Sequence, residues 1–256
     1  AIKKADLGIA MGLTGTDVTK EASDMILEDD NFTSIVNAIE EGRGIYENIK
    51  KFINYLLSAN LAEVLVVFLA ILLGLPLPMT AVMILWLNLV TDGLPALALS
   101  FDPYPKDVMK RSPKKAGEGI LNKSLIFIII YVSMFITTGV LLLFLWGMSK
   151  YSGSDLYMGK IQTIAFTSLV VMELARLQAI RSEYKLGVFS NKYLIIAVLS
   201  SLLLQLAVIY TPLSRFFGTT FLSLIDWGMI IVVSAGVFII SVFGVVIKNK
   251  IFNRKI

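Results

Sequence analysis

Six apolar runs along the 256-residue chain are each long enough to cross a lipid bilayer as a helix. They lie at about residues 53–74, 79–101, 124–147, 161–180, 193–211 and 226–247. The short stretches between them are richer in polar and charged residues. The pattern therefore predicts a mainly α-helical, polytopic membrane protein built as a six-helix transmembrane bundle.

The first 41 residues follow a different pattern. Short apolar runs at residues 7–11 and 24–27 predict two buried β-strands, with a short helix at residues 17–22 between them. Thr16 is the expected N-cap of that helix, and Asn31 the expected cap of the next. Such a small set of elements cannot form an independent core, so we expect this α/β piece to dock on further chain.

A long helical pattern begins near Arg43 and continues without a proline to about Gly74. At 1.5 Å per residue it is about 45 Å long, more than the hydrocarbon core of a bilayer requires. Lys50 and Lys51 are expected at the membrane surface. We therefore divide the chain into residues 1–41 and a stalk with the membrane bundle at residues 42–256.

Basic residues are concentrated in alternate loops, as the positive-inside rule describes. The loop after the second run carries the largest set: Lys106, Lys110, Arg111, Lys114, Lys115 and Lys123. This alternation predicts that both termini are cytoplasmic. It also accounts for the net charge of +4 without binding to nucleic acid.

Composition narrows the possible chemistry. Hydrophobic residues make up 56% of the chain and charged residues 16%, and there is neither Cys nor His. Disulfides, thiolate nucleophiles and His- or Cys-ligated metals are therefore excluded, and a bound metal would have to accept oxygen ligands. The sequence has no Walker A motif and no Gly-x-Gly-x-x-Gly. It starts at Ala1 in a polar stretch with no visible signal peptide, and we expect a piece of a longer polypeptide.

The second apolar run contains three side chains with oxygen ligands. Asn88, Thr91 and Asp92 stand at positions i, i+3 and i+4, which share one face of an α-helix. A carboxylate at membrane depth costs roughly 3 kcal/mol or more, so it usually faces a partner, a cavity or an ion. Gly93 and Pro95 follow directly, and there we expect the helix to unwind and expose backbone carbonyls.

Further oxygen ligands occur in the first and fourth runs. Asn60 and Glu63 share one face of the first, and Glu173 lies within the fourth. Three carboxylates, two amides and one hydroxyl can supply the six to eight hard ligands that Ca²⁺ prefers. The sequence therefore predicts an intramembrane divalent-cation site formed by Asn60, Glu63, Asn88, Thr91, Asp92 and Glu173.

Other interpretations remain open for these polar groups. They could join helices by hydrogen bonds, or Glu63 could be protonated. Arg176, three residues after Glu173, could neutralise Glu173 as an internal ion pair. Gln205 in the fifth run is better explained as a helix–helix hydrogen-bonding group than as a ligand.

Three groups of motifs in the first 99 residues are the most specific part of a resemblance that runs along the whole chain. The first group is residues 3–12 with 14–18, 20–24 and 29–32, and the second is residues 40–43 with 49–52. The third is residues 85–99, which include Asn88, Thr91 and Asp92. These resemble, in order, the end of the phosphorylation (HAD-like) domain, the stalk of the fifth membrane helix, and the sixth membrane helix of P-type ATPases of the calcium-transporting group.

The resemblance implies a fold and a mechanism. The six runs would be family helices five to ten, and the six predicted ligands match that group's calcium ligands on its fifth, sixth and eighth helices. The whole pump would couple ATP hydrolysis, through an aspartyl-phosphate and with Mg²⁺, to Ca²⁺ transport. Glu63 and Thr91 together resemble the two-site reticulum-type pumps.

The same resemblance defines what this sequence lacks. It has no Asp-Lys-Thr-Gly motif and no Gly-Asp-Gly-x-Asn-Asp motif. The implied partners are the lipid bilayer and an N-terminal part with phosphorylation, nucleotide and actuator domains and helices one to four. We expect the fragment to be inactive alone, and its parent to be a multi-pass pump, in a prokaryotic plasma membrane. The alternatives are a pump for Mn²⁺ or Na⁺, and a non-catalytic membrane remnant or binding subunit.

Overall fold

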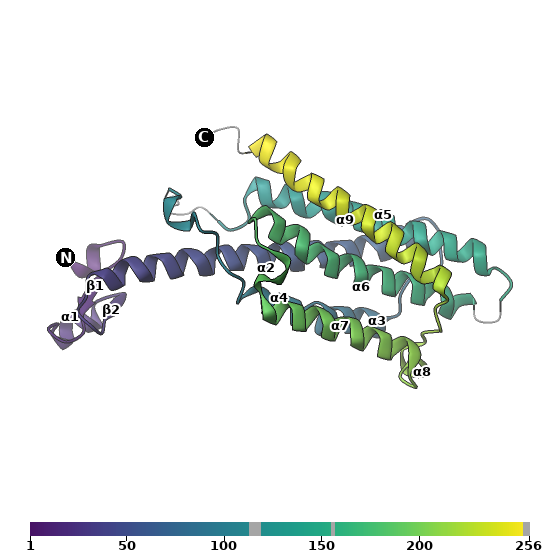
Figure 1. The fold of residues 1–256 in the computed structure, drawn as a ribbon, viewed down its shortest axis with the longest axis horizontal. Helices are drawn as coiled ribbons and strands as arrows, with labels where there is room; N and C mark the ends of the chain where they lie inside the picture. Colours follow the sequence, from purple (N-terminus) through teal and green to yellow (C-terminus); the bar gives the residue numbers. More distant parts are fainter. Residues whose placement is uncertain (113–118, 155–156, 253–256) are drawn as a thin grey trace. The chain divides into compact units, whose positions relative to one another are not determined.

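The computed structural model describes residues 1–112, 119–154 and 157–252. Figure 1 shows the order of the helices and strands along the chain. The chain divides into two compact units. The first contains residues 1–47 and 106–112, and the second contains the other described residues. Helix α2 supplies residues to both.

The first unit begins with a small α/β unit, as the sequence predicts. After the 3₁₀ turn η1 (Ile2–Lys4), strands β1 (Ile9–Met11) and β2 (Met25–Leu27) pair in parallel on either side of helix α1 (Asp17–Glu21) in the chain. The side chain of Thr16 accepts a hydrogen bond from the backbone N–H of Thr19 at 3.3 Å, which confirms the predicted cap of α1.

The prediction of buried strands is wrong for the described residues. Ala10 and Leu27 are buried, whereas Ile26 is 47% exposed and Met11 is 37% exposed. Two three-residue strands and one five-residue helix can cover only part of such a sheet.

One carboxylate holds the loop that follows β1. Asp30 Oδ1 accepts a hydrogen bond from the Leu13 N–H at 2.8 Å, and Oδ2 accepts from the N–H and the hydroxyl of Thr14 at 2.8 Å and 2.7 Å. These bonds hold the pKa of Asp30 below its ordinary value, and the bond from Leu13 contributes most. Asp30 itself has a positive φ of 51°, a conformation that Asp tolerates better than most residues.

Six helical stretches in the described residues are long and apolar enough to cross a membrane, which confirms the six-span prediction and the fold class. In chain order they are α2 (Thr33–Leu72), α3–η2–α4 (Ala81–Trp86, Leu87–Thr91, Gly93–Leu99), α5 (Lys123–Tyr151), α6 (Tyr157–Glu183), α7 (Lys192–Tyr210) and α9 (Leu224–Phe252). Short helices η3 (Val108–Lys110), η4 (Val188–Ser190) and α8 (Ser214–Phe217) lie in the connections.

The helices extend beyond several of the predicted spans because the edge of an apolar run marks the hydrocarbon boundary, not the last helical hydrogen bond. The largest difference is in α2, which begins at Thr33 rather than near Arg43. Asn31 Oδ1 accepts hydrogen bonds from the N–H of Thr33 at 3.0 Å and from its hydroxyl at 2.6 Å, so it caps the start of α2 as predicted.

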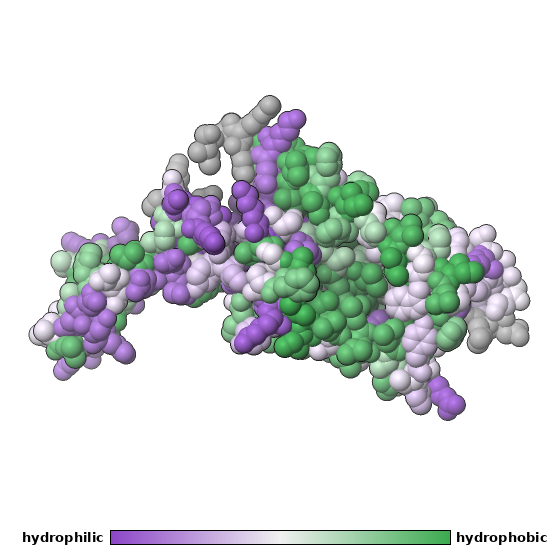
Figure 2. Space-filling model, viewed as in Figure 1, coloured by the Kyte–Doolittle hydropathy of each residue, from purple (hydrophilic) through white to green (hydrophobic). Residues whose placement is uncertain are grey.

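Helix α6 is the most deeply buried of the six spans and packs against both α5 and α9 (Figure 1). Helix α4 packs against α7. The outer faces of these helices are mainly apolar, as Figure 2 shows, and include exposed Phe68, Leu85 and Val232. The chain is thus an integral, multi-pass membrane protein whose polar side chains within the spans are largely turned inward.

Candidate cation site

Three carboxylates from three helices meet inside the second unit. Glu63 comes from α2, Asp92 from the junction of η2 and α4, and Glu173 from α6. Each offers one oxygen, and these three atoms lie within 4.8 Å of one another. Glu63, Asp92 and Glu173 are 5%, 1% and 1% exposed, so water screens the interactions between their carboxylates only weakly.

Most of the oxygens in this carboxylate cluster lack a partner in the described part of the chain. Glu63 Oε1, Asp92 Oδ2 and both carboxylate oxygens of Glu173 are buried and accept no hydrogen bond. A buried, unpaired carboxylate is strongly unfavourable unless it is neutralised. Such a gathering of unsatisfied acceptors is typical of a place where a cation binds or protons are held.

A π-helical turn places Asp92 in the cluster. Residues Leu87–Thr91 form this turn, and the N–H of Asp92 donates to the Leu87 carbonyl, five residues earlier, at 2.9 Å. π turns inside α-helices occur frequently at functional sites. Here the wider turn rotates the following residues about the helix axis relative to a regular α-helix.

The predicted unwinding at Gly93 and Pro95 does not occur. Both residues lie in the first turn of α4, where backbone N–H groups have no acceptor within the helix, so the missing N–H of proline costs no intrahelical hydrogen bond. The departure from α-helical geometry instead comes just before them, in η2. The helix therefore accommodates Pro95 without exposing an extended segment.

Two neighbouring side chains contact the carboxylates directly. Asn88 Nδ2 donates to Glu63 Oε2 at 2.7 Å and to the Ile84 carbonyl at 3.0 Å. The Tyr55 hydroxyl donates to Asp92 Oδ1 at 3.0 Å. The bonds from Asn88 to Glu63 and from Tyr55 to Asp92 each join α2 to the second span and fix one oxygen of a carboxylate.

The other two predicted ligands are less closely connected. Thr91 is buried, but its hydroxyl donates to the Leu87 carbonyl of its own helix at 3.0 Å. Asn60 is partly buried, and no hydrogen bond in the described residues joins it to the carboxylates. The structure therefore brings together Glu63, Asn88, Asp92 and Glu173 and leaves Thr91 and Asn60 beside them.

The alternative ion pair between Glu173 and Arg176 is not formed. Arg176 is buried and its Nη2 donates to Asn54 Oδ1 on α2 at 3.0 Å, while its Nε and Nη1 have no partner in the described residues. Its long side chain reaches away from Glu173 to a different helix. Arg176 therefore does not neutralise Glu173.

Gln205 behaves as its sequence position predicts. Its Nε2 donates to Thr167 Oγ1 at 3.2 Å, joining α7 to α6.

Sequence reasoning missed Tyr55 as part of the cluster. It lies eight residues before Glu63, on the i, i+4, i+8 stripe of α2, and that spacing could have identified it.

Comparison with known proteins finds similarity to cation-transporting ATPases. The family model described as "Cation transporting ATPase, C-terminus" matches residues 76–245. A calcium-transporting ATPase of Bacillus subtilis is 48% identical over 92% of this chain, and calcium-transporting ATPase 1 of Bacillus cereus is 43% identical over 91%. The mouse calcium-transporting ATPase type 2C member 2 is 42% identical over 94%. This chain covers 26%, 28% and 26% of these relatives, about a quarter of their length.

Proposed function

Because the chain belongs to the cation-transporting P-type ATPases, as part of their C-terminal membrane region, we propose that it forms the transport domain of a longer calcium pump. In this proposal Glu63, Asp92 and Glu173 hold the transported Ca²⁺. The supporting relatives are named as calcium-transporting ATPases.

The main support for this proposal is the spacing of the carboxylate oxygens. Ca²⁺ binds oxygen at 2.3–2.6 Å, so two ligands on opposite sides of one ion are at most about 5 Å apart. The three oxygens lie within 4.8 Å of one another, which is compatible with one shared ion. An ion there would neutralise the buried charge that the described residues leave without partners.

The chemistry of the ligands favours a divalent ion. Three carboxylates carry more negative charge than Na⁺ can balance, and hard oxygen ligands suit Ca²⁺. Asn88, Thr91 and Asn60 would complete the coordination. The Asn88 amide oxygen is suited to this role because its nitrogen already donates to Glu63, and the Thr91 oxygen keeps lone pairs while its hydrogen is donated.

ATP and Mg²⁺ chemistry is assigned to the rest of the polypeptide. Neither Asp-Lys-Thr-Gly nor Gly-Asp-Gly-x-Asn-Asp is present in this sequence, so the chain alone would not hydrolyse ATP. Residues 1–41 would be the end of the phosphorylation domain and residues 42–256 the stalk and transport domain. Both termini would be cytoplasmic, in a prokaryotic plasma membrane.

The test uses the full-length polypeptide that carries this chain, in native membranes. Formation of the phosphoenzyme from ATP is measured at micromolar Ca²⁺ for the wild type, Asp92→Asn and Asp226→Asn. Asp226 is a matched control because it is also fully buried but binds Lys150 and Lys160 at 3.0 Å and 3.1 Å. Asp92→Asn should abolish calcium-dependent phosphorylation, and Asp226→Asn should retain it.

Normal phosphoenzyme in Asp92→Asn would refute the proposed site. Activation of the wild type by Mn²⁺ or Na⁺ but not by Ca²⁺ would identify a pump for another ion. A wild type that forms no phosphoenzyme with any of these ions would support a non-catalytic membrane protein.

A further inference from the structure

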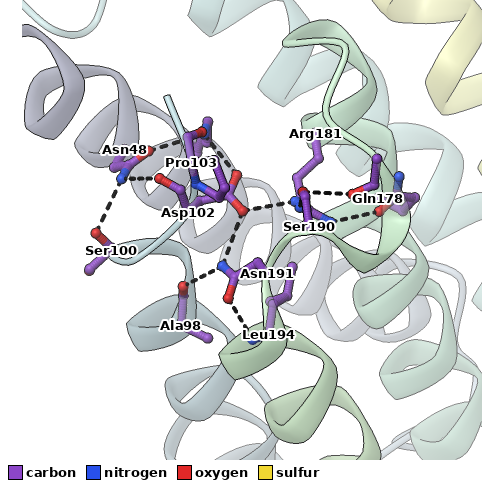
Figure 3. A network of polar contacts seen from close by, with 12 residues as sticks. Asn48, Ala98, Ser100, Asp102, Pro103, Gln178, Arg181, Ser190, Asn191 and Leu194 are labelled. Atoms are coloured by element: carbon purple, nitrogen blue, oxygen red, sulfur yellow. Dashed lines mark hydrogen bonds and ion pairs between the residues drawn. The ribbon is translucent and has the colours of Figure 1, made fainter. Parts of the chain in front are cut away.

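A second buried charge network joins the same three helices. Asp102, three residues after α4, is 1% exposed. Its Oδ2 lies 2.8 Å from Lys51 Nζ, and its Oδ1 lies 2.9 Å from Arg181 Nε (Figure 3). The side chains of all three residues have no exposed surface. One carboxylate thus binds two buried cations.

The members of this network come from the helices that carry the cation site. Lys51 is on α2 with Glu63, and Arg181 is on α6 with Glu173. Asp102 lies three residues after α4, the helix that follows Asp92. Lys51 precedes Glu63 by twelve positions near the middle of α2, whereas Asp102 and Arg181 follow their carboxylates by ten and eight positions. A single side chain therefore links all three carboxylate-bearing helices.

Polar contacts to the backbone strengthen the link to α4. Asn48 Nδ2 donates to the carbonyls of Ser100 and Asp102 at 3.1 Å and 2.7 Å. Asn191 Nδ2 donates to the Ala98 carbonyl at 3.0 Å and to Asp102 Oδ1 at 3.1 Å. Side chains from α2 and from the start of α7 thus bind carbonyls at the end of α4 and just beyond it.

The network has its partners in place, unlike the carboxylate cluster. Lys51 Nζ also donates to Asn48 Oδ1 and to the Pro103 carbonyl at 3.0 Å and 3.1 Å. Arg181 Nη1 donates to Gln178 Oε1 and to the Val188 carbonyl at 3.2 Å and 3.1 Å, and Nη2 contacts Ser190 Oγ (Figure 3). Such a satisfied network favours one fixed arrangement of helices over ligand binding.

We infer that Asp102 is a positioning residue for the cation site: it fixes the spacing of α2, α4 and α6 and so sets the affinity of Glu63, Asp92 and Glu173 for their ion. This inference rests on the proposed function. Asp102 does not contact the ion, because it lies ten positions after Asp92, and the seven residues of α4 between them alone span about 10 Å at 1.5 Å per residue. Binding sites require ligand positions held within about 0.5 Å, so small shifts of these helices change affinity.

Loss of the carboxylate would release the helices from one another. Asp102→Asn preserves the shape of the side chain but leaves Lys51 and Arg181 buried without their anion, and like charges at close range repel. The expected consequence is a change in helix spacing at this end of the bundle. The carboxylates of the cation site themselves remain unaltered in sequence.

The test is equilibrium binding of ⁴⁵Ca²⁺ to the purified full-length polypeptide, with the dissociation constant and the number of sites determined separately. We expect Asp102→Asn to raise the dissociation constant about tenfold, within the range of energetic coupling between distant residues, at an unchanged number of sites per folded molecule. A merely structural role would lower the number of competent molecules and leave the dissociation constant of the remainder unchanged.

Asp226→Asn is again the matched control. It removes a buried carboxylate on α9 that pairs with Lys150 and Lys160. Lys160 lies near the first residue of α6, whereas Arg181 lies near the last, so this control acts at the opposite end of α6. Its dissociation constant should equal that of the wild type. An equal rise in Asp226→Asn would overturn the inference, as would wild-type affinity in Asp102→Asn.

Lys51→Met provides a second route if Asp102→Asn does not fold, because it leaves the pair of Asp102 with Arg181 intact. It should raise the dissociation constant severalfold, and wild-type affinity would count against the inference. In the variant that carries both Asp102→Asn and Lys51→Met, the dissociation constant should rise by less than the product of the two separate increases, because both residues act through one contact. A wild type that binds no Ca²⁺ would refute the proposed function itself.

Discussion

Tyr55 on α2 donates its phenolic hydrogen to Oδ1 of Asp92 across 3.0 Å, and both side chains are almost completely buried. The second oxygen of Asp92, Oδ2, has no partner in the described residues. Tyr55 therefore holds one oxygen in place and leaves the other available to the carboxylate cluster. This hydrogen bond connects the first and second spans at the level of the site.

Tyr55→Phe should lower the affinity for Ca²⁺ about tenfold, because a hydrogen bond to a charged group contributes about 1.5–3 kcal/mol and here it orients a ligand. Calcium-dependent phosphorylation of the full-length polypeptide, titrated with Ca²⁺, measures the shift. Tyr131→Phe is the control, since Tyr131 stacks on Phe127 and no hydrogen bond of its hydroxyl occurs in the described residues. A shift of equal size in both variants would show that the hydroxyl of Tyr55 has no specific role.

Arg176→Gln should raise the affinity for Ca²⁺. Arg176 places a buried positive charge one helical turn from Glu173 without pairing with it, and this charge repels a cation in the site. At an effective dielectric constant of about 20, two unit charges about 10 Å apart repel each other by about 1–2 kcal/mol. We therefore expect the affinity for Ca²⁺ to rise at least tenfold when the charge of Arg176 is removed.

The matched control is Arg215→Gln, which removes the same charge from an exposed position on α8. Counting bound ions in the same ⁴⁵Ca²⁺ titration also shows whether the charge of Arg176 limits their number. Unchanged affinity and unchanged stoichiometry in Arg176→Gln would exclude an electrostatic effect of Arg176 on the site.

Gly244→Ala should destabilise the packing of α9 on α5 by about 1–3 kcal/mol, the usual cost of overpacking. A Cβ atom at Gly244 would lie 2.4 Å from Cε1 of Tyr131, so the ring or the helix would have to move. Gly236→Ala on the same helix has no atom within 4 Å of its new Cβ and gains the same helix propensity. The difference between their thermal unfolding midpoints in detergent measures the clash, and equal midpoints would contradict it.

Acid should release the loop held by Asp30. Its pKa is lowered from an ordinary value of 3.8 by hydrogen bonds from Leu13 and Thr14, so the ionised carboxylate favours the folded loop. This contribution is present above about pH 4 and is lost as the pH falls from there through the lowered pKa. Hydrogen exchange of the Leu13 and Thr14 amides, corrected for the intrinsic rate, should accelerate in that range, and Asp30→Asn should remove the pH dependence.

The sequence alone identified the three carboxylates that the structure brings together. Glu63, Asp92 and Glu173 stand out because ionisable residues in apolar helices are costly and therefore informative. That any of the six predicted residues is a ligand remains a prediction. Among the described residues, Asn88 is the one of the other three predicted residues that donates a hydrogen bond to the cluster. Sequence spacing alone could not show this, because the bond depends on how the neighbouring helix packs.

Lys51 has a buried partner that sequence reasoning missed. Its position beside an apolar run predicted a cation at the membrane surface, yet its side chain is completely buried against Asp102. The two residues are 51 positions apart, and nothing in local periodicity connects them. A buried ion pair between distant residues is decided by how helices pack, so its partner could not be assigned from the sequence.

The six spans, the caps at Thr16 and Asn31, and the carboxylates of the site were determined by the sequence itself. These features depend on hydrophobicity, on local hydrogen bonding and on the cost of charge in an apolar run, all of which act between near neighbours. The π turn at Leu87–Thr91, the separation of Arg176 from Glu173 and the network around Asp102 were decided only by the tertiary structure. Each depends on which side chains face one another across different helices, and packing of the whole bundle sets those distances.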